Sequence, residues 1–343
     1  MSVSDFEAEA RTRLPGQVAD YFAAASGSGV SLLEGTADWG AVRFRPRVLR
    51  DVSQVDSATT VLGTPVRMPI MVAPMAQQVA AHPDGECAMA RAVAATGSLL
   101  GVSTNAAVPF ADINAAGAPW WFQVYVSRDR SLTELLVQRA VQDGARALIL
   151  TVDMVALLSP AVDPRFWPES PGKSRLTNLT PDELAAAGPT GVELDPTVGF
   201  ADIAWLAQLS GLPVLVKGVL RGDDAVRCLD SGAAGVVVST HGGRRMGASI
   251  SSARALPEVI AAVDGRAEVY VDSGLRTGEH VAAALAMGAR GVFIGRPTLW
   301  ALAARGEPGV RIVLEDLAVD LRQVMLQLGV ARPDDLVPDL IAS

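Results

Sequence analysis

Eight short apolar runs recur along the chain, each followed by a polar or glycine break and then by an alanine-rich stretch. The runs show no alternation of apolar and polar positions, which is typical of strands buried on both faces in a parallel sheet. They are PIMVAPM (69–75), SLLGVS (98–103), WWFQVYV (120–126), ALILTVD (147–153), PVLVKGV (213–219), GVVVST (235–240), VYVDSG (269–274) and GVFIGR (291–296).

The stretches between the runs have the composition of helices. Four of them, GECAMARAVAATG, LTELLVQRAVQDG, GDDAVRCLDSG and TGEHVAAALAMG, end in glycine, the usual residue just past a helix C-terminus. Eight evenly spaced strand–helix units predict an α/β fold, a (β/α)8 TIM barrel. A doubly wound sheet with a second domain is the alternative, and the count of eight favours the barrel.

Two segments do not follow the repeat. Residues 1–65 precede the first strand and predict an N-terminal helical extension, with FRPRVLRDVS packed against the barrel. Residues 154–200 separate the fourth and fifth strands and are rich in Pro, Ser, Thr and Gly, which predicts a long active-site loop or lid. We therefore expect residues 1–343 to form a single barrel domain with these two additions.

Composition narrows the functional class. The 343 residues include 29 Lys and Arg against 37 Asp and Glu, a net charge of −8, which argues against a nucleic-acid partner. The apolar runs fall short of the about 20 residues needed to span a bilayer, and the acidic N-terminus predicts no signal peptide. Two cysteines and three scattered histidines predict no metal site. We expect a cytoplasmic protein that binds neither nucleic acid nor membrane.

Chemically useful residues collect where the predicted strands end, which is where barrels of this kind hold their active sites. Lys217 lies in an apolar strand, where its charge is costly unless an anion pairs with it. His241 is followed by two glycines and Arg244, a pattern that favours a catalytic role over a structural one. For lone aspartates and serines at such turns, a helix N-cap is the simpler interpretation. The other candidates at strand ends are Pro74, Met75, Ala76, Ser103, Gln123, Tyr125, Thr151, Asp153, Ser239 and Asp272.

Two arginines flanked by glycines follow the last two strands. DSGLRTG contains Arg276 and IGRP contains Arg296, at the corner where such barrels commonly bind phosphate. Backbone amides, a helix N-terminus and the arginine charges together predict a phosphate site, with a surface position as the weaker alternative. No GxGxxG after a strand and no Walker A sequence occurs, which disfavours a Rossmann or P-loop site.

With these residues in place, the sequence resembles the FMN-dependent 2-hydroxy-acid oxidases and dehydrogenases, the family of glycolate oxidase, lactate oxidase and mandelate dehydrogenase. The resemblance extends from about Leu14 to the C-terminal helix and rests on segments such as LPGQVADYFAAASGSG, APMAQQVAAHPDGECAMARA, WFQVYVSRDR, GAAGVVVSTHGGR and VYVDSGLRTG. It implies FMN as the cofactor and oxidation of an L-2-hydroxy acid to the 2-keto acid, with electrons passed to oxygen or another acceptor. It also implies a homo-oligomer, commonly a tetramer.

The resemblance implies a role for each candidate catalytic residue. His241 would take a proton from the substrate, and Asp153 would stabilise the resulting imidazolium. Arg244 would anchor the substrate carboxylate in bidentate fashion. Tyr21 and Tyr125 would donate hydrogen bonds to the substrate.

The resemblance also implies how FMN is held. Lys217 would lie beside the pyrimidine ring of the flavin, where its charge favours the anionic reduced form. Ala76 beside the flavin is similar to the residue of oxidase-type members. The expected FMN contacts are Pro74, Met75, Ala76, Ser103, Gln123, Thr151, Lys217, Ser239, Asp272, Gly274, Arg276, Gly295 and Arg296.

The sequence departs from the family pattern around the substrate. Thr240 stands for an asparagine, Arg245-Met246-Gly247 for Gln-Leu-Asp, and Ser273 for a glycine. The loop after the fourth strand lacks the usual arginine, for which Arg165 or Arg245 would have to substitute. These changes predict retained FMN binding and an altered substrate, bulkier or less polar than glycolate. The alternative is an enzyme on the same barrel that acts on a different substrate class, by oxidation of an amine carbon or by isomerisation.

Overall fold

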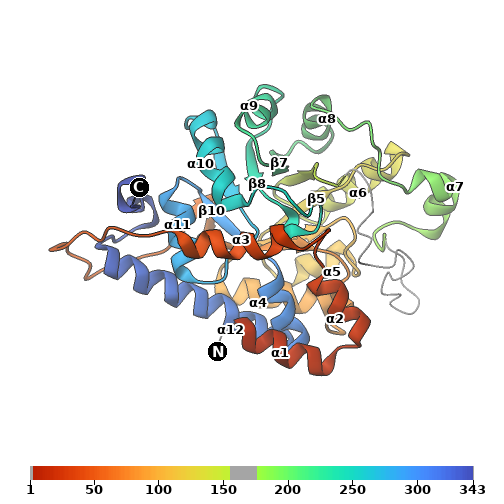
Figure 1. The fold of residues 1–343 in the computed structure, drawn as a ribbon. Coiled ribbons are helices and arrows are strands. Elements are labelled where there is room, and N and C mark those ends of the chain that lie inside the picture. Colours follow the sequence, from red (N-terminus) through yellow and green to blue (C-terminus); the bar gives the residue numbers. More distant parts are fainter. Residues whose placement is uncertain (1–2, 155–175, 343) are drawn as a thin grey trace.

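Eight parallel strands close into a barrel in the computed structural model, which describes residues 3–154 and 176–342 (Figure 1). Each strand pairs with its neighbours in chain order, and β10 pairs with β3 to close the ring. All eight apolar runs form barrel strands, which confirms the predicted (β/α)8 fold. The strands are β3 (Ile70–Met75), β4 (Leu100–Ser103), β5 (Trp120–Val124), β6 (Leu148–Thr151), β7 (Val214–Val219), β8 (Gly235–Val238), β9 (Glu268–Val271) and β10 (Gly291–Ile294).

Helices surround the barrel, and all four predicted from glycine-terminated stretches are present (Figure 1). Gly97 ends the first of them in the left-handed conformation, with a φ of 68° that other residues rarely adopt. None of the described helices is both long and apolar enough to cross a bilayer. The surrounding helices are α4 (Gly85–Thr96), α5 (Phe110–Ala115), α6 (Arg130–Gln142), α8 (Ala201–Ser210), α9 (Gly222–Asp230), α10 (Ser252–Val263), α11 (Gly278–Ala286) and α12 (Arg296–Leu328).

A hairpin absent from the sequence prediction closes the N-terminal end of the barrel. Strands β1 (Thr59–Val61) and β2 (Thr64–Val66) pair antiparallel, and both place a valine in the inner core of the barrel. The amide of Leu62 donates to Glu268 Oε2 at the start of β9, over 2.9 Å. With this end plugged, the C-terminal end is left for a site.

The predicted N-terminal helical extension reaches the C-terminal end of the barrel. It contains α1 (Val3–Arg13), α2 (Gly16–Ala23) and α3 (Val30–Ala41). Arg305 of α12 contacts Glu9 of α1, with Nη2 and Oε2 2.8 Å apart. The amide of Ser26 donates to the Gly243 carbonyl over 2.8 Å, and the Trp39 indole donates to the Ser273 carbonyl over 3.0 Å. The extension therefore supplies part of the wall around the strand ends.

The segment 154–200 was expected to form one long loop, but its described part includes a helix. It contains α7 (Pro181–Gly191), which begins with a capping box: Thr180 Oγ1 accepts the Glu183 amide, and Glu183 accepts the Thr180 amide. This pairing satisfies free amides at the helix N-terminus. The sequence Thr-Pro-Asp-Glu is typical of such a helix start, but the Pro-rich composition of the segment favoured a loop. Residues 155–175, including Arg165, lie outside the described residues, so the predicted lid stays a prediction.

Candidate active site

Side chains alternate between the inside and the outside of the barrel along each strand. The inward-facing residues near the strand ends therefore bring polar groups to the C-terminal end of the barrel. Successive side chains of a strand point to opposite faces, so a residue two positions after an inner core residue faces the same axis. Trp121 lies in the inner core, and Gln123 follows it; Leu215 lies there too, and Lys217 follows. The same step leads from Ile149 to Thr151, from Val237 to Ser239, from Tyr270 to Asp272 and from Phe293 to Gly295.

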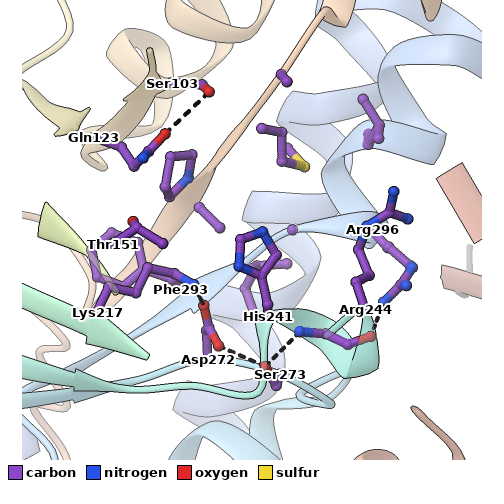
Figure 2. A pocket seen from close by; sticks show the side chains of 18 of the residues that line it. Ser103, Gln123, Thr151, Lys217, His241, Arg244, Asp272, Ser273, Phe293 and Arg296 are labelled. Carbon is purple, nitrogen blue, oxygen red and sulfur yellow. Dashed lines mark hydrogen bonds and ion pairs between the residues drawn. The ribbon is translucent and has the colours of Figure 1, made fainter. Parts of the chain in front are cut away.

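A single cavity at this end gathers most of the predicted site residues. Figure 2 shows Ser103, Gln123, Thr151 and Lys217 on one side of it, with Arg244 and Arg296 on the other. Asp153 and Ser239 do not line the cavity but touch His241 and Lys217, which do. The predicted residues that line it are Tyr21, Pro74, Met75, Ala76, Ser103, Gln123, Tyr125, Thr151, Lys217, His241, Arg244, Asp272, Gly274, Arg276, Gly295 and Arg296.

Lys217 is buried and paired. Its Nζ lies 3.1 Å from Asp272 Oδ2, and the two side chains are only 5% and 9% exposed. The same Nζ donates to Ser239 Oγ over 2.8 Å. Asp272 is therefore an ion-pair partner and not the helix cap considered from the sequence; Thr277 caps α11 instead. An ion pair this deep is stable only with such additional hydrogen bonds.

His241 and Asp153 form the second charged pair. His241 Nδ1 lies 2.9 Å from Asp153 Oδ1. Burial alone would raise the pKa of Asp153, but His241 in its protonated form, the Lys217 charge and the hydrogen bond from His241 outweigh it and lower that pKa to about 2. Burial lowers the pKa of His241, against the opposing effect of Asp153. At neutral pH the ring is then neutral, with Nδ1–H donating to Asp153 and Nε2 left to accept a proton.

Three partly buried arginines gather at the opposite side of the cavity. Within residues 3–154 and 176–342, none of Arg244, Arg276 and Arg296 forms an ion pair with a carboxylate. Burial and the charges of the other two lower the pKa of Arg296 to about 9. Their guanidinium groups donate instead to backbone carbonyls, including those of Tyr21 and Ala24. Such an uncompensated cluster fits a dianionic ligand group such as a phosphate.

The other side of the cavity offers neutral hydrogen-bonding groups. Gln123 Nε2 and Thr151 Oγ1 are buried, and neither has a hydrogen-bond partner among the described residues. Buried polar atoms are normally satisfied, so these two point to a bound group that carries polar atoms of its own. The polar edge of a flavin ring would match these neutral groups and the Lys217 ammonium, just as a phosphate would match the arginines on the other side.

Tyr21 and Tyr125 lie at the cavity together with the histidine. Tyr125 is 9% exposed, and its burial, reinforced by the Asp153 charge, raises its pKa well above the usual value. Its hydroxyl therefore remains a donor at all working pH values. The guanidinium carbon of Arg244 lies 4.9 Å from the centroid of the Tyr21 ring, a cation–π contact that fixes both side chains.

Some lining residues were not assigned a role from the sequence. The carbonyls of Phe22 and Ala24 accept hydrogen bonds from Arg296, which depends on a tertiary contact that no local pattern reveals. Arg245 lines the cavity, and its buried Nε has no hydrogen-bond partner in the part of the chain that the structure describes. From the sequence, Arg245 was a candidate only as a substitute for the missing loop arginine, and Ser273 was only a departure from the family pattern.

Comparison with known proteins shows the family to which the chain belongs. Residues 10–343 match the family model described as FMN-dependent dehydrogenase. The chain is 39% identical to an L-lactate oxidase of Nostoc sp. over 98% of this chain and 96% of that protein. It is 39% identical to glycolate oxidase 1 of Oryza sativa subsp. indica over 98% and 94% of the two chains. The crystal structure of a mandelate oxidase superposes with a TM-score of 0.90 at 36% identity, covering 99% and 97% of the two chains.

Proposed function

The chain belongs to the FMN-dependent dehydrogenase family, and from this membership we propose that it oxidises an L-2-hydroxy acid to the corresponding 2-keto acid. The observation that carries the proposal is a histidine that lines the cavity beside an arginine and is hydrogen-bonded to an aspartate just behind it. The lactate-, glycolate- and mandelate-oxidising relatives do not favour oxidation of an amine carbon or an isomerisation. The enzyme is an FMN-dependent oxidoreductase that acts on a CH–OH group.

FMN is held in this proposal by the two complementary sides of the cavity. Arg276 and Arg296 bind its phosphate, and Lys217 lies beside its pyrimidine ring. When bound, FMN takes up the electron pair that leaves the substrate and passes it to oxygen or another acceptor. The other proposed contacts are Pro74, Met75, Ala76, Ser103, Gln123, Thr151, Ser239, Asp272, Gly274 and Gly295.

The substrate is held by its carboxylate and its hydroxyl. Arg244 binds the carboxylate, in the orientation that its contact with Tyr21 fixes. Arg245, whose buried Nε has no hydrogen-bond partner in residues 3–154 and 176–342, supplies the second positive charge that the family usually takes from the loop after the fourth strand. Tyr125 and Tyr21 donate hydrogen bonds to the substrate oxygens.

His241 moves the proton. Its neutral ring accepts a substrate proton at Nε2 and becomes an imidazolium, whose charge the Asp153 carboxylate stabilises across 2.9 Å. The depressed pKa of Asp153 keeps that carboxylate ionised throughout the reaction.

We extend the proposal to the organisation of the protein. Residues 1–343 act as one FMN-binding unit in which segment 154–200 covers the active site, and the chain works in the cytoplasm as a homotetramer. Exposed Leu33 and Met246, on segments joined by the Ser31–Met246 hydrogen bond, give apolar surface of the kind that oligomers bury. Light scattering after gel filtration measures the subunit number, and cell fractionation measures the location.

The visible spectrum of the purified protein tests the function. We expect a flavin band that bleaches anaerobically on addition of a pool of aliphatic and aryl 2-hydroxy acids, and dividing the pool then identifies the substrate. His241→Ala should keep the band and lose the bleaching. A band that no 2-hydroxy acid bleaches would overturn the proposed substrate class, and a protein that binds no flavin would overturn the proposed cofactor site.

A further inference from the structure

Two serine hydroxyls capture three consecutive amides around His241. The amides of Thr240 and Gly242 donate to Ser273 Oγ over 3.2 and 2.9 Å, and the amide of His241 itself donates to Ser239 Oγ over 3.0 Å. Ser273 Oγ in turn donates to Asp272 Oδ1 over 2.6 Å (Figure 2). The backbone that carries the histidine is therefore tied directly to the acidic partner of Lys217.

The turn that these hydroxyls hold has an unfavourable backbone. His241 has a φ of +54° in η2 (His241–Gly243), and Ser273 has a φ of +72°. Residues with a Cβ populate this left-handed region only when surrounding contacts enforce it. Without the hydrogen bonds to Ser273, the backbone on both sides of His241 would relax toward commoner dihedral angles and carry the imidazole with it.

The backbone of Ser273 and the side chain of the preceding Asp272 are each held by further contacts. Its carbonyl accepts hydrogen bonds from Trp39 Nε1 of α3 over 3.0 Å and from Ser252 Oγ of α10 over 2.9 Å. Asp272 is held by the buried Lys217 over 3.1 Å. The hydroxyl of Ser273 consequently has a defined position relative to the barrel, which a mobile surface serine would not have.

We propose that Ser273 is a positioning residue for His241: by clamping the amides on both sides of the histidine, its hydroxyl holds Nδ1 against Asp153 and Nε2 toward the substrate. The importance of the His241 orientation for catalysis rests on the proposed function, whereas the effect of Ser273 on the orientation of the imidazole ring does not. A hydroxyl that only filled space would leave the ring orientation unchanged when removed.

Nuclear magnetic resonance of the imidazole nitrogens tests the clamp without any turnover. The chain has only three histidines, so a ¹⁵N-histidine-labelled holoenzyme gives few signals, and His241→Ala assigns the one in question. The Asp153 contact predicts an Nδ1–H tautomer in the unaltered enzyme. In Ser273→Ala we expect at least a several-fold rise in the Nε2–H population, because the ring no longer stays aligned with Asp153.

Kinetics with matched variants separate the clamp from general stability. Ser98→Ala is the control, since Ser98 is fully buried and its hydroxyl donates to the Ile70 carbonyl over 2.6 Å, in the body of the barrel. We expect Ser273→Ala to slow anaerobic flavin reduction by about 10- to 100-fold with little change in substrate affinity, since small misplacements of a reacting group have effects of this size. Ser98→Ala should leave both the rate and the ring signals unchanged.

The variant Ser273→Gly distinguishes the effect of losing the hydroxyl from the effect of backbone strain at this position. Glycine relieves the positive φ, so a loss in this variant similar to that in Ser273→Ala assigns the effect to the hydroxyl. Unaltered ring signals and reduction rate in Ser273→Ala, or recovery of both in Ser273→Gly, would overturn the proposal. If no 2-hydroxy acid reduces the unaltered enzyme, the proposed function fails, and the ring signals still decide whether the clamp exists.

Discussion

Replacing Asp153 by asparagine isolates the charge that faces the catalytic histidine. Asparagine has nearly the same shape, so the contact with His241 Nδ1 at 2.9 Å can persist while the negative charge is lost. That charge stabilises the imidazolium formed when the substrate gives up its proton. With charge centres about 4 Å apart and an effective dielectric constant near 20, the attraction is about 4 kcal/mol. The asparagine oxygen can still accept the hydrogen bond from Nδ1–H, so this value is an upper limit.

At about 1.4 kcal/mol per factor of ten, the loss corresponds to a reduction rate about 10²- to 10³-fold below that of the unaltered enzyme. Stopped-flow measurement of anaerobic flavin bleaching gives this rate, and its dependence on substrate concentration gives the affinity, which should change little. Asp202→Asn is the matched control, because Asp202 is a buried carboxylate paired with Arg130 outside the cavity. A rate in Asp153→Asn within about threefold of normal would refute the assignment of His241 and Asp153 as a proton-accepting pair.

Variants at three further residues and one pH profile test the charges of the cavity. Because His241 must be neutral to accept a proton and its pKa is depressed below 6.5, kcat/KM should fall only when the pH drops below that value, and steady-state rates across pH measure the midpoint. Arg296→Ala should weaken FMN binding about 10- to 100-fold through the loss of a charge-assisted contact to the phosphate, measured by fluorescence titration of FMN. Arg245→Gln should raise KM about tenfold with a smaller effect on kcat, whereas Arg245→Lys should restore part of the affinity, measured by steady-state kinetics. Lys217→Met should destabilise the protein by about 3–5 kcal/mol because it leaves Asp272 buried without a counter-charge; urea unfolding at a fixed FMN concentration measures the loss, and an unchanged midpoint contradicts it.

The barrel was predictable because its signal repeats. Buried parallel strands are apolar on both faces, and eight such runs alternating with glycine-terminated helices fit few other folds. The β1–β2 hairpin escaped prediction because three-residue strands carry no periodicity. The helix α7 escaped because a Pro- and Gly-rich composition outweighed a local capping signal at Thr180 and Glu183.

The members of the site were predictable where their place at the end of a strand decides that they reach the cavity. A residue such as Lys217, at an inward-facing position near the end of a strand, has to reach the barrel mouth whatever its partners are. Which groups meet there is a tertiary property. The Lys217–Asp272 pair joins two strands that are not neighbours in the chain, and the carbonyls that receive Arg296 come from residues 22 and 24 at the far end of the sequence. The hydrogen bonds of Ser273 depend on a left-handed backbone conformation that cannot be predicted from the neighbouring residues in the sequence.

The charges of the cavity also explain how this site can be both buried and stable. Five cationic side chains line the cavity: Lys217, Arg244, Arg245, Arg276 and Arg296. Asp272 pairs with Lys217, and Asp153, just behind the lining, pairs with His241, which leaves an excess of positive charge among these described residues. An FMN phosphate and a substrate carboxylate together carry about three negative charges, which match the excess. Because unpaired buried charges are costly, each ligand that enters relieves repulsion already present, most directly at Arg296, whose pKa is depressed by burial and by the neighbouring arginines. The folded protein should therefore gain stability stepwise with FMN and then with a non-reacting carboxylate, since ligands that bind only the native state stabilise it.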